Sequence, residues 1–147
     1  MSDQLKDDPS QEQLAKALPQ LTEEQIAEVS PKFKRELFEP GEGIIQQGEI
    51  ADYFYIVIDG YVEIWHESLE GESEMLDVRG QGEYFGETGL LQNRPRTATV
   101  RAPKDARVVV LVLDSSDFEE MMDESKAAEM HVAREMIQRL ISLANVQ

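Results

Sequence analysis

The sequence contains no cysteine and only two histidines, His66 and His131, among its 147 residues. Without cysteine a chain has no disulfide framework, no thiol nucleophile and no thiolate ligand for a metal. Two histidines far apart in the sequence are too few for a polyhistidine zinc centre. The composition therefore argues against thiol enzymes and against metalloenzymes that depend on a histidine cluster.

Basic residues and long apolar runs are also scarce. The chain has 14 lysines and arginines against 30 aspartates and glutamates, and its formal net charge is -16. A field of this sign repels DNA, RNA and anionic membranes, so we expect no nucleic acid partner, although one arginine could hold a small anion. No apolar run approaches the roughly 20 residues of a membrane span. The polar N-terminus is unlike a signal peptide, and we expect a cytoplasmic protein with no membrane span.

The residues that are present are typical of one globular domain. Hydrophobic residues make up 41% of the chain and charged residues 30%, the balance of a folded protein of this length. Between residues 33 and 113, short apolar runs alternate with glycine- or proline-containing turn signals, which predicts a β-sandwich or roll. The expected strands are 36–39, 43–46, 53–58, 61–65, 74–79, 97–101 and 107–113.

The clearest turn signal is the pair Asp59-Gly60. It lies between two runs rich in β-formers, Tyr53–Ile58 and Tyr61–Trp65. An Asp-Gly pair favours a type I′ turn, in which both central residues have positive φ. The sequence therefore predicts that the two runs pair as a hairpin.

Helices are expected at both ends of the chain. Thr22 and Gln25 fit a capping box and predict one short helix that ends at Pro31, preceded by a flexible lead-in over the first dozen residues. After Asp114, apolar residues recur mostly three and four positions apart, which predicts one C-terminal helix over 115–147 with a wide apolar face. That face must cover the roll, a ligand or a partner chain.

The most specific chemistry lies in residues 85–100, which read Phe-Gly-Glu-Thr-Gly-Leu-Leu-Gln-Asn-Arg-Pro-Arg-Thr-Ala-Thr-Val. A short helical turn that opens at Gly86 leaves free backbone N–H groups, which bind anions. Arg96 offers a two-pronged donor for phosphate oxygens, and Glu87 can accept a hydrogen bond from a sugar hydroxyl. Together they suit a ribose phosphate, whereas either residue alone could belong to a surface ion pair.

This segment resembles the phosphate-binding cassette of cyclic nucleotide-binding domains, which occur in cyclic-nucleotide-dependent kinases, gated ion channels and bacterial catabolite regulators. The shared pattern is Phe-Gly-Glu, two residues and Leu, then Pro-Arg, a Ser, Thr or Ala, and Ala-x-Val. The resemblance covers residues 33–140 and implies a mainly β fold with flanking helices. That fold is an eight-stranded antiparallel double-stranded β-helix (a jelly roll) with an N-terminal helix and a C-terminal lid helix. It divides the chain into a lead-in with a short helix (1–30), the nucleotide-binding roll (31–114) and a helical lid or output segment (115–147).

The resemblance also implies a role for each residue of the cassette. Arg96 is expected on the cyclic phosphate and Glu87 on the ribose hydroxyl. Gly86 and Thr88 are expected to supply backbone contacts, and Thr97 lies beside the phosphate and the base. In the kinase branch Thr at this position resembles cGMP-binding members and Ala resembles cAMP-binding ones, whereas channel domains with Thr accept both. The base is therefore not settled, and family frequency alone leans slightly to cAMP.

A second group of residues is expected around the base. Arg139 and Leu143 lie one turn apart on the expected C-terminal helix, and the resemblance places them over the base. Arg139 could equally be a solubilising residue among acids. Leu76 and Val78 are expected to line the base side of the roll.

The implied function is that of a regulatory sensor and not of an enzyme. It binds cAMP or cGMP as its ligand, needs no other cofactor and transmits binding through its C-terminal helix. Two alternatives remain: a β-roll that has lost its ligand and serves as an interaction surface, and a cupin-like enzyme, which two histidines make difficult. After Leu113 the chain is too short for a helix-turn-helix domain, a kinase or a pore. We therefore expect a free-standing sensor or a fragment, with a homodimer partner or a missing effector domain against its last helix.

Overall fold

Two four-stranded antiparallel sheets form the centre of the computed structural model, which describes residues 9–146 and the side chains of residues 11–142. One sheet has the order β1-β8-β3-β6 and the other β2-β7-β4-β5. The strands of the described chain are β1 (Lys34–Phe38), β2 (Gly43–Ile45), β3 (Tyr53–Asp59), β4 (Tyr61–Glu67), β5 (Ser73–Gly80), β6 (Tyr84–Phe85), β7 (Thr99–Arg101) and β8 (Val108–Asp114). Antiparallel strands in this order make a jelly roll, so the expected fold is confirmed.

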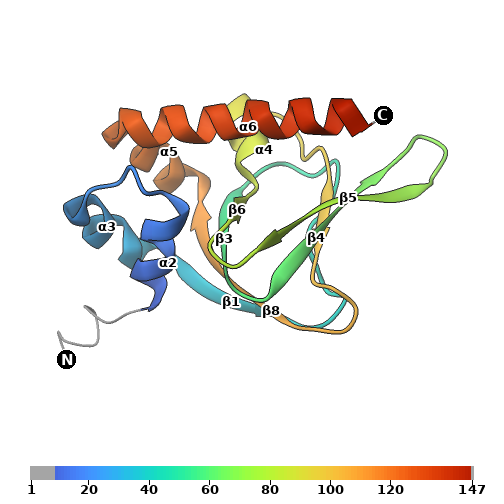
Figure 1. The fold of residues 1–147 in the computed structure, drawn as a ribbon, viewed down its shortest axis with the longest axis horizontal. Helices are drawn as coiled ribbons and strands as arrows, with labels where there is room; N and C mark the ends of the chain where they lie inside the picture. Colours follow the sequence, from blue (N-terminus) through green and yellow to red (C-terminus); the bar gives the residue numbers. More distant parts are fainter. Residues whose placement is uncertain (1–8, 147) are drawn as a thin grey trace.

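Helices gather against one side of the roll. The described helices are α2 (Pro9–Ala17), α3 (Glu23–Val29), α4 (Glu87–Gln92), α5 (Ser115–Glu124) and α6 (Lys126–Val146), with a 3₁₀ turn η1 (Ser30–Lys32) after α3. Figure 1 shows α2, α3 and α5 grouped at one end of the sheets, while the long helix α6 runs across the top, over α4. The N-terminal and C-terminal helices share one apolar core with the outer face of the β1-β8-β3-β6 sheet.

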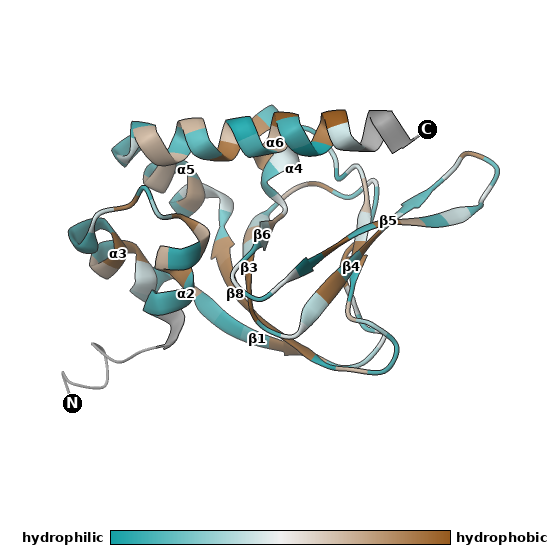
Figure 2. Ribbon diagram, viewed as in Figure 1, coloured by the Kyte–Doolittle hydropathy of each residue, from teal (hydrophilic) through white to brown (hydrophobic). Residues whose placement is uncertain are grey.

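The two central strands of that sheet, β3 and β8, are buried on both faces. Along β3, Phe54 and Ile56 face the helices, whereas Tyr55 and Val57 face the second sheet. Because successive side chains point to opposite faces, a strand covered on both faces reads as a continuous apolar run. Figure 2 shows β8 mostly brown for this reason. The unbroken hydrophobic runs of the sequence thus mark the strands that lie between the helices and the second sheet.

The hairpin predicted around Asp59-Gly60 is wrong. β3 pairs with β6 and β8, whereas β4 pairs with β5 and β7, so the two runs lie in different sheets. Gly60 has a φ of 85°, but Asp59 does not have a positive φ, so the turn is not type I′. A Cβ at Gly60 would come within 2.9 Å of the carbonyl oxygen of Arg107. The dipeptide makes a tight turn as predicted, but the strands on either side of it pair with different partners, and the chain passes from one sheet into the other.

Part of the expected flexible lead-in is helical. α2 begins at Pro9. Leu14 lies in this helix and Leu18 follows its last residue, and both side chains are buried in the core beside β3. The capping box of Thr22 and Gln25 is confirmed at the start of α3. The prediction of a flexible first dozen residues is therefore wrong from Pro9 onward, and the preceding residues lie outside the described part of the chain.

The C-terminal helix predicted as one segment is two helices that meet at Ser125. Ser125 has non-helical φ and ψ angles of −135° and 95°, and its Oγ accepts a hydrogen bond from the backbone N–H of Ala128 at 3.1 Å. Ala128 and Val132, early in α6, are fully buried, whereas Ile137 and Ile141 are 52% and 51% exposed. The start of the helix is thus anchored in the core, and Ile137 and Ile141 lie on a half-exposed face of it. The three-part division of the chain stays a prediction.

Among the helices of residues 9–146, none has both the length and the apolarity that a membrane crossing requires.

Candidate functional site

A cavity of about 360 Å³ lies between the second sheet, α4 and the later half of α6. Its apolar lining includes Ile45, Ile64, Leu76, Val100 and Leu140. Its titratable lining residues are His66, Glu74, Arg79, Glu87, Arg96 and Arg139. Arg79 and Arg139 are paired with Asp77 and Glu87, whereas Arg96 is a cation of the lining with no ion-pair partner among the described side chains, on a protein whose net charge is -16. Such a cavity attracts an anion that the rest of the surface repels.

The start of α4 approaches the cavity through its backbone. Phe85 is buried and its ring stacks on that of Tyr55 with centroids 4.8 Å apart, which fixes the strand end before the loop. Gly86 follows with a φ of 88°. A Cβ there would lie 3.1 Å from the carbonyl oxygen of Tyr53 and 3.2 Å from Nη1 of Arg96. Position 86 therefore needs glycine both for its backbone angle and for the space that the arginine occupies.

Arg96 is a buried cation whose direct partners are neutral. The residue is 8% exposed, and it donates hydrogen bonds from Nη1 to the carbonyl oxygen of Gly86 at 2.7 Å and from Nη2 to that of Tyr53 at 2.6 Å. Among the described side chains, no carboxylate lies within ion-pair distance of it. Burial lowers the pKa of the Arg96 guanidinium because desolvation disfavours its charge. An anion in the cavity would supply the missing counter-charge.

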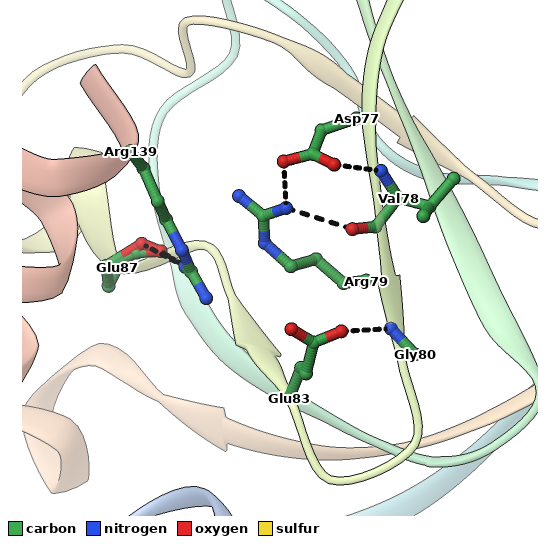
Figure 3. Close-up of polar contacts among 7 residues, drawn as sticks. All are labelled: Asp77, Val78, Arg79, Gly80, Glu83, Glu87 and Arg139. Atoms are coloured by element: carbon green, nitrogen blue, oxygen red, sulfur yellow. Dashed lines mark hydrogen bonds and ion pairs between the residues drawn. The ribbon is translucent and has the colours of Figure 1, made fainter. Parts of the chain in front are cut away.

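Glu87 is the most deeply buried acid of the cavity, and it is paired with the C-terminal helix. Nη1 of Arg139 donates to Oε1 of Glu87 at 2.6 Å and to Oε2 at 3.1 Å (Figure 3). The Arg139 guanidinium lies over the ring of Tyr84, 4.6 Å from its centroid. Burial raises the pKa of the Glu87 carboxyl, and the positive charges of Arg139 and Arg79 oppose that rise. The pair therefore joins the cassette to α6 at the cavity wall.

Sequence reasoning missed Arg79, which the structure places in the cavity wall on β5. Its side chain is 10% exposed, and Nη1 donates to Oδ2 of Asp77 at 2.6 Å and to the carbonyl oxygen of Val78 at 2.9 Å. Figure 3 shows this guanidinium opposite Glu87 and Arg139. The sequence did contain a signal for it, because Arg79 is a charged residue inside a predicted strand. Charged side chains are rarely buried unless they are paired.

Most of the predicted site residues line this one cavity: Leu76, Gly86, Glu87, Thr88, Arg96, Thr97 and Arg139. Val78 does not line it, so that prediction is wrong. Its side chain is 43% exposed because the alternation of the strand turns it away while Arg79 points inward (Figure 3). Leu143 lies outside the residues whose side chains the structure describes. The contacts of these residues with a nucleotide stay predictions.

Residues 35–125 match the sequence profile of the family described as "Cyclic nucleotide-binding domain". The chain belongs to the cyclic nucleotide-binding domain family. The match runs from β1 to the end of α5 and includes the whole cassette. It confirms the resemblance on which the expected fold rested. The family is one of regulatory nucleotide-binding domains and not of catalytic ones.

Similar sequences occur within longer proteins. The chain is 39% identical over 93 residues to an uncharacterized ABC transporter ATP-binding protein of Mycobacterium tuberculosis, covering 58% of the chain and 28% of that protein. It is 34% identical over 104 residues to a cGMP-dependent protein kinase of Caenorhabditis briggsae (69% and 14%). It is 33% identical over 99 residues to a cAMP-dependent protein kinase regulatory subunit of Mycosarcoma maydis (65% and 19%). The chain spans less than a third of the length of each of these relatives.

Solved structures share the fold. The regulatory domain of Toxoplasma gondii PKA, crystallised with cAMP, superposes with a TM-score of 0.78 at 24% identity, over 86% of this chain and 48% of that one. The catabolite activator protein of Thermus thermophilus superposes with a TM-score of 0.72 at 27% identity, over 86% of this chain and 58% of that one.

Proposed function

We propose that this domain binds a 3′,5′-cyclic purine nucleotide, cAMP or cGMP, and passes the binding signal to α6. The observation that carries the proposal is Arg96, a buried guanidinium in a cavity wall whose hydrogen-bond partners are two backbone carbonyls. A cyclic phosphodiester carries one negative charge and two exocyclic oxygens, which match such a donor. Membership of the family and the names of the two kinase relatives support a cyclic nucleotide as that anion.

Glu87 provides the second contact. Arg139 donates to both of its oxygens, but a carboxylate has about four lone-pair sites and can accept further hydrogen bonds. A ribose 2′-hydroxyl would donate to the same group that α6 already contacts. Binding would therefore act on the helix through a shared carboxylate, which is how we expect the signal to leave the domain.

Two other functions make different demands on these residues. A roll that serves only as an interaction surface has no need for Arg96 and Glu87 to be buried in one cavity wall. A cupin-like enzyme needs a cluster of metal ligands, and His66 is the single histidine of the cavity lining. We therefore infer a binding role and no catalysis. A homodimer or effector partner and a cytoplasmic location stay predictions.

Titration calorimetry with cAMP and cGMP tests the proposal. We expect micromolar or tighter binding of at least one of them, a free energy of about −8 kcal/mol or better. The matched control is 5′-AMP, which carries a phosphate but lacks the cyclic diester and should bind more weakly. If neither cyclic nucleotide releases heat or shifts the melting temperature of the folded protein, the domain is not a cyclic nucleotide sensor.

A further inference from the structure

The hydroxyl of Tyr84 is a buried donor without a partner. Tyr84 lies on β6, directly before the cassette, and is 3% exposed. Its Oη forms no hydrogen bond with any described residue. A buried polar group without a partner is destabilising, and a phenylalanine would fill nearly the same space without that cost. We therefore expect the hydroxyl to find its partner in another state of the domain.

The ring of Tyr84 is already packed on its neighbours. Two of them come from α6: the Arg139 guanidinium lies over the ring, 4.6 Å from its centroid, and the His131 ring meets it edge-on at 6.3 Å. The ring of Phe54 lies 5.5 Å from it in a tilted arrangement. These contacts depend on the aromatic ring and not on the hydroxyl. A substitution that removes only the hydroxyl leaves them in place.

Glu135 lies on the same face of α6 as the two residues that contact this ring. His131, Glu135 and Arg139 are four positions apart along the helix, and residues with that spacing are neighbours on its surface. Because the first and the last of the three contact Tyr84, the middle one lies beside the same ring. Burial raises the pKa of the Tyr84 hydroxyl, and the charge of Glu135 adds to that rise.

Two carboxylates act on the Tyr84 hydroxyl, those of Glu87 and Glu135. Both oxygens of Glu87 accept from Arg139, and the proposed function adds a ribose hydroxyl to the same group. Glu135 is partly buried and forms no ion pair with the described side chains. Glu135 is therefore the available acceptor for Tyr84.

We propose that Tyr84 is a positioning residue for nucleotide binding: when the cavity is occupied, its hydroxyl donates to Glu135 and holds α6 against the roll. The inference rests on the proposed function and goes beyond it, because neither Tyr84 nor Glu135 lines the cavity. In the free domain α6 is held by the pair of Arg139 and Glu87. A ribose hydroxyl that shares Glu87 weakens this pair, and a shift of α6 then brings the acceptor one turn earlier onto the unused donor. Because the new hydrogen bond exists only in the occupied state, it contributes to ligand affinity.

Tyr84→Phe tests the proposal, because it removes the hydroxyl alone. The ligand-free variant should melt at the same temperature as the parent or higher, since the lost donor has no partner in that state. Its affinity should nevertheless fall by about 3- to 10-fold, the value of one hydrogen bond. The probe is whichever of cAMP and cGMP the parent binds more tightly, measured by titration calorimetry. A residue that only supports the fold would lower the melting temperature and leave the affinity unchanged.

Glu135→Ala should cause the same loss of affinity. The double variant with Tyr84→Phe should lose no more than either single variant, because both remove one shared hydrogen bond. Removing an acid near the cavity would by its charge alone strengthen the binding of an anion, so weaker binding identifies the hydrogen bond. Glu119→Ala, which removes an exposed acid of α5, is the matched control and should bind within about twofold of the parent.

The inference is overturned if Tyr84→Phe binds as tightly as the parent, or if Glu135→Ala weakens binding as much in the Tyr84→Phe background as in the parent. A ligand-free Tyr84→Phe protein that is less stable than the parent also overturns it, since the hydroxyl would then have a partner without ligand. If the parent binds neither cyclic nucleotide, the proposed function fails and this inference fails with it.

Discussion

The carboxylate of Glu87 and the guanidinium of Arg139, 52 residues apart in the sequence, meet at 2.6 Å in the wall of the cavity. Glu87 opens α4 in the cassette, and Arg139 lies in the later half of α6. The side chain of Glu87 is 4% exposed and that of Arg139 is 20% exposed, so water screens the contact only in part. A ligand that engages the carboxylate therefore changes the energy of a contact made by the C-terminal helix.

Replacing Arg96 with alanine should remove the principal phosphate contact. A charge-assisted, bidentate interaction in a partly dry site contributes on the order of 2–4 kcal/mol, so affinity should fall by about 30- to 1000-fold. Titration calorimetry measures the loss. Arg94→Ala is the matched control, because Arg94 is an exposed arginine of the same loop that donates to Gln92. If the Arg96 variant is folded and binds within about threefold of the parent, the phosphate assignment is wrong.

Sugar recognition depends on the buried carboxylate of Glu87. A 2′-deoxy cyclic nucleotide lacks the hydroxyl that would donate to it, so we expect binding at least about tenfold weaker than that of the ribonucleotide. Competition between the two ligands measures the ratio directly. Glu87→Gln should reduce this ratio, since the amide oxygen is a weaker acceptor than a carboxylate. If the parent protein binds the ribonucleotide and the 2′-deoxynucleotide with equal affinity, Glu87 does not contact the sugar.

The ion pair also makes stability depend on pH. Burial raises the pKa of Glu87 above its ordinary value of 4.5, and Arg139 opposes the rise. Arg139→Leu should raise it further. A carboxyl with a raised folded pKa binds its proton more tightly when folded, so the free energy of unfolding falls as pH rises from 4.5 toward the folded pKa. We expect the variant to be less stable than the parent by about 1–3 kcal/mol near neutral pH, and nearly equal to it in acid.

Denaturant unfolding at several pH values measures this difference. The control is the same substitution in a Glu87→Gln background, where no carboxyl titrates at this position and the cost of Arg139→Leu should not depend on pH. A cost that stays constant with pH in the presence of Glu87 would show that Arg139 acts through its packing on Tyr84 and not through its charge.

Ligand binding should order the later half of α6. Phe118 and Met121 already hold α5 in the core, whereas Ile137 and Ile141 in α6 remain half exposed. Adding cyclic nucleotide should therefore slow amide hydrogen exchange over residues 137–142 and leave residues 115–124 nearly unchanged. Slower exchange confined to residues 85–97 would show that the domain holds its ligand without transmitting to the helix.

The cassette could be recognised from the sequence because its geometry is local. Gly86 and Arg96 are ten residues apart and are joined by one hydrogen bond across a single loop. The short helix between them, with a glycine at its start, brings the arginine back beside that glycine. Few other sequences have the same spacing. The strands were predictable for a similar reason, since burial on one or both faces leaves a pattern in each strand by itself.

Only the tertiary structure decided which separate segments meet. The turn at Asp59-Gly60 is local, but the sheets that β3 and β4 join depend on partners elsewhere in the chain. Arg79 lies in the cavity wall because the alternation along β5 turns it inward and Val78 outward, and a register change of one residue would reverse the two. Arg139 reaches Glu87 because the chain breaks at Ser125 and redirects α6 across the roll. Such long-range contacts depend on how the sheets and helices pack together, and no local pattern in the sequence encodes that packing.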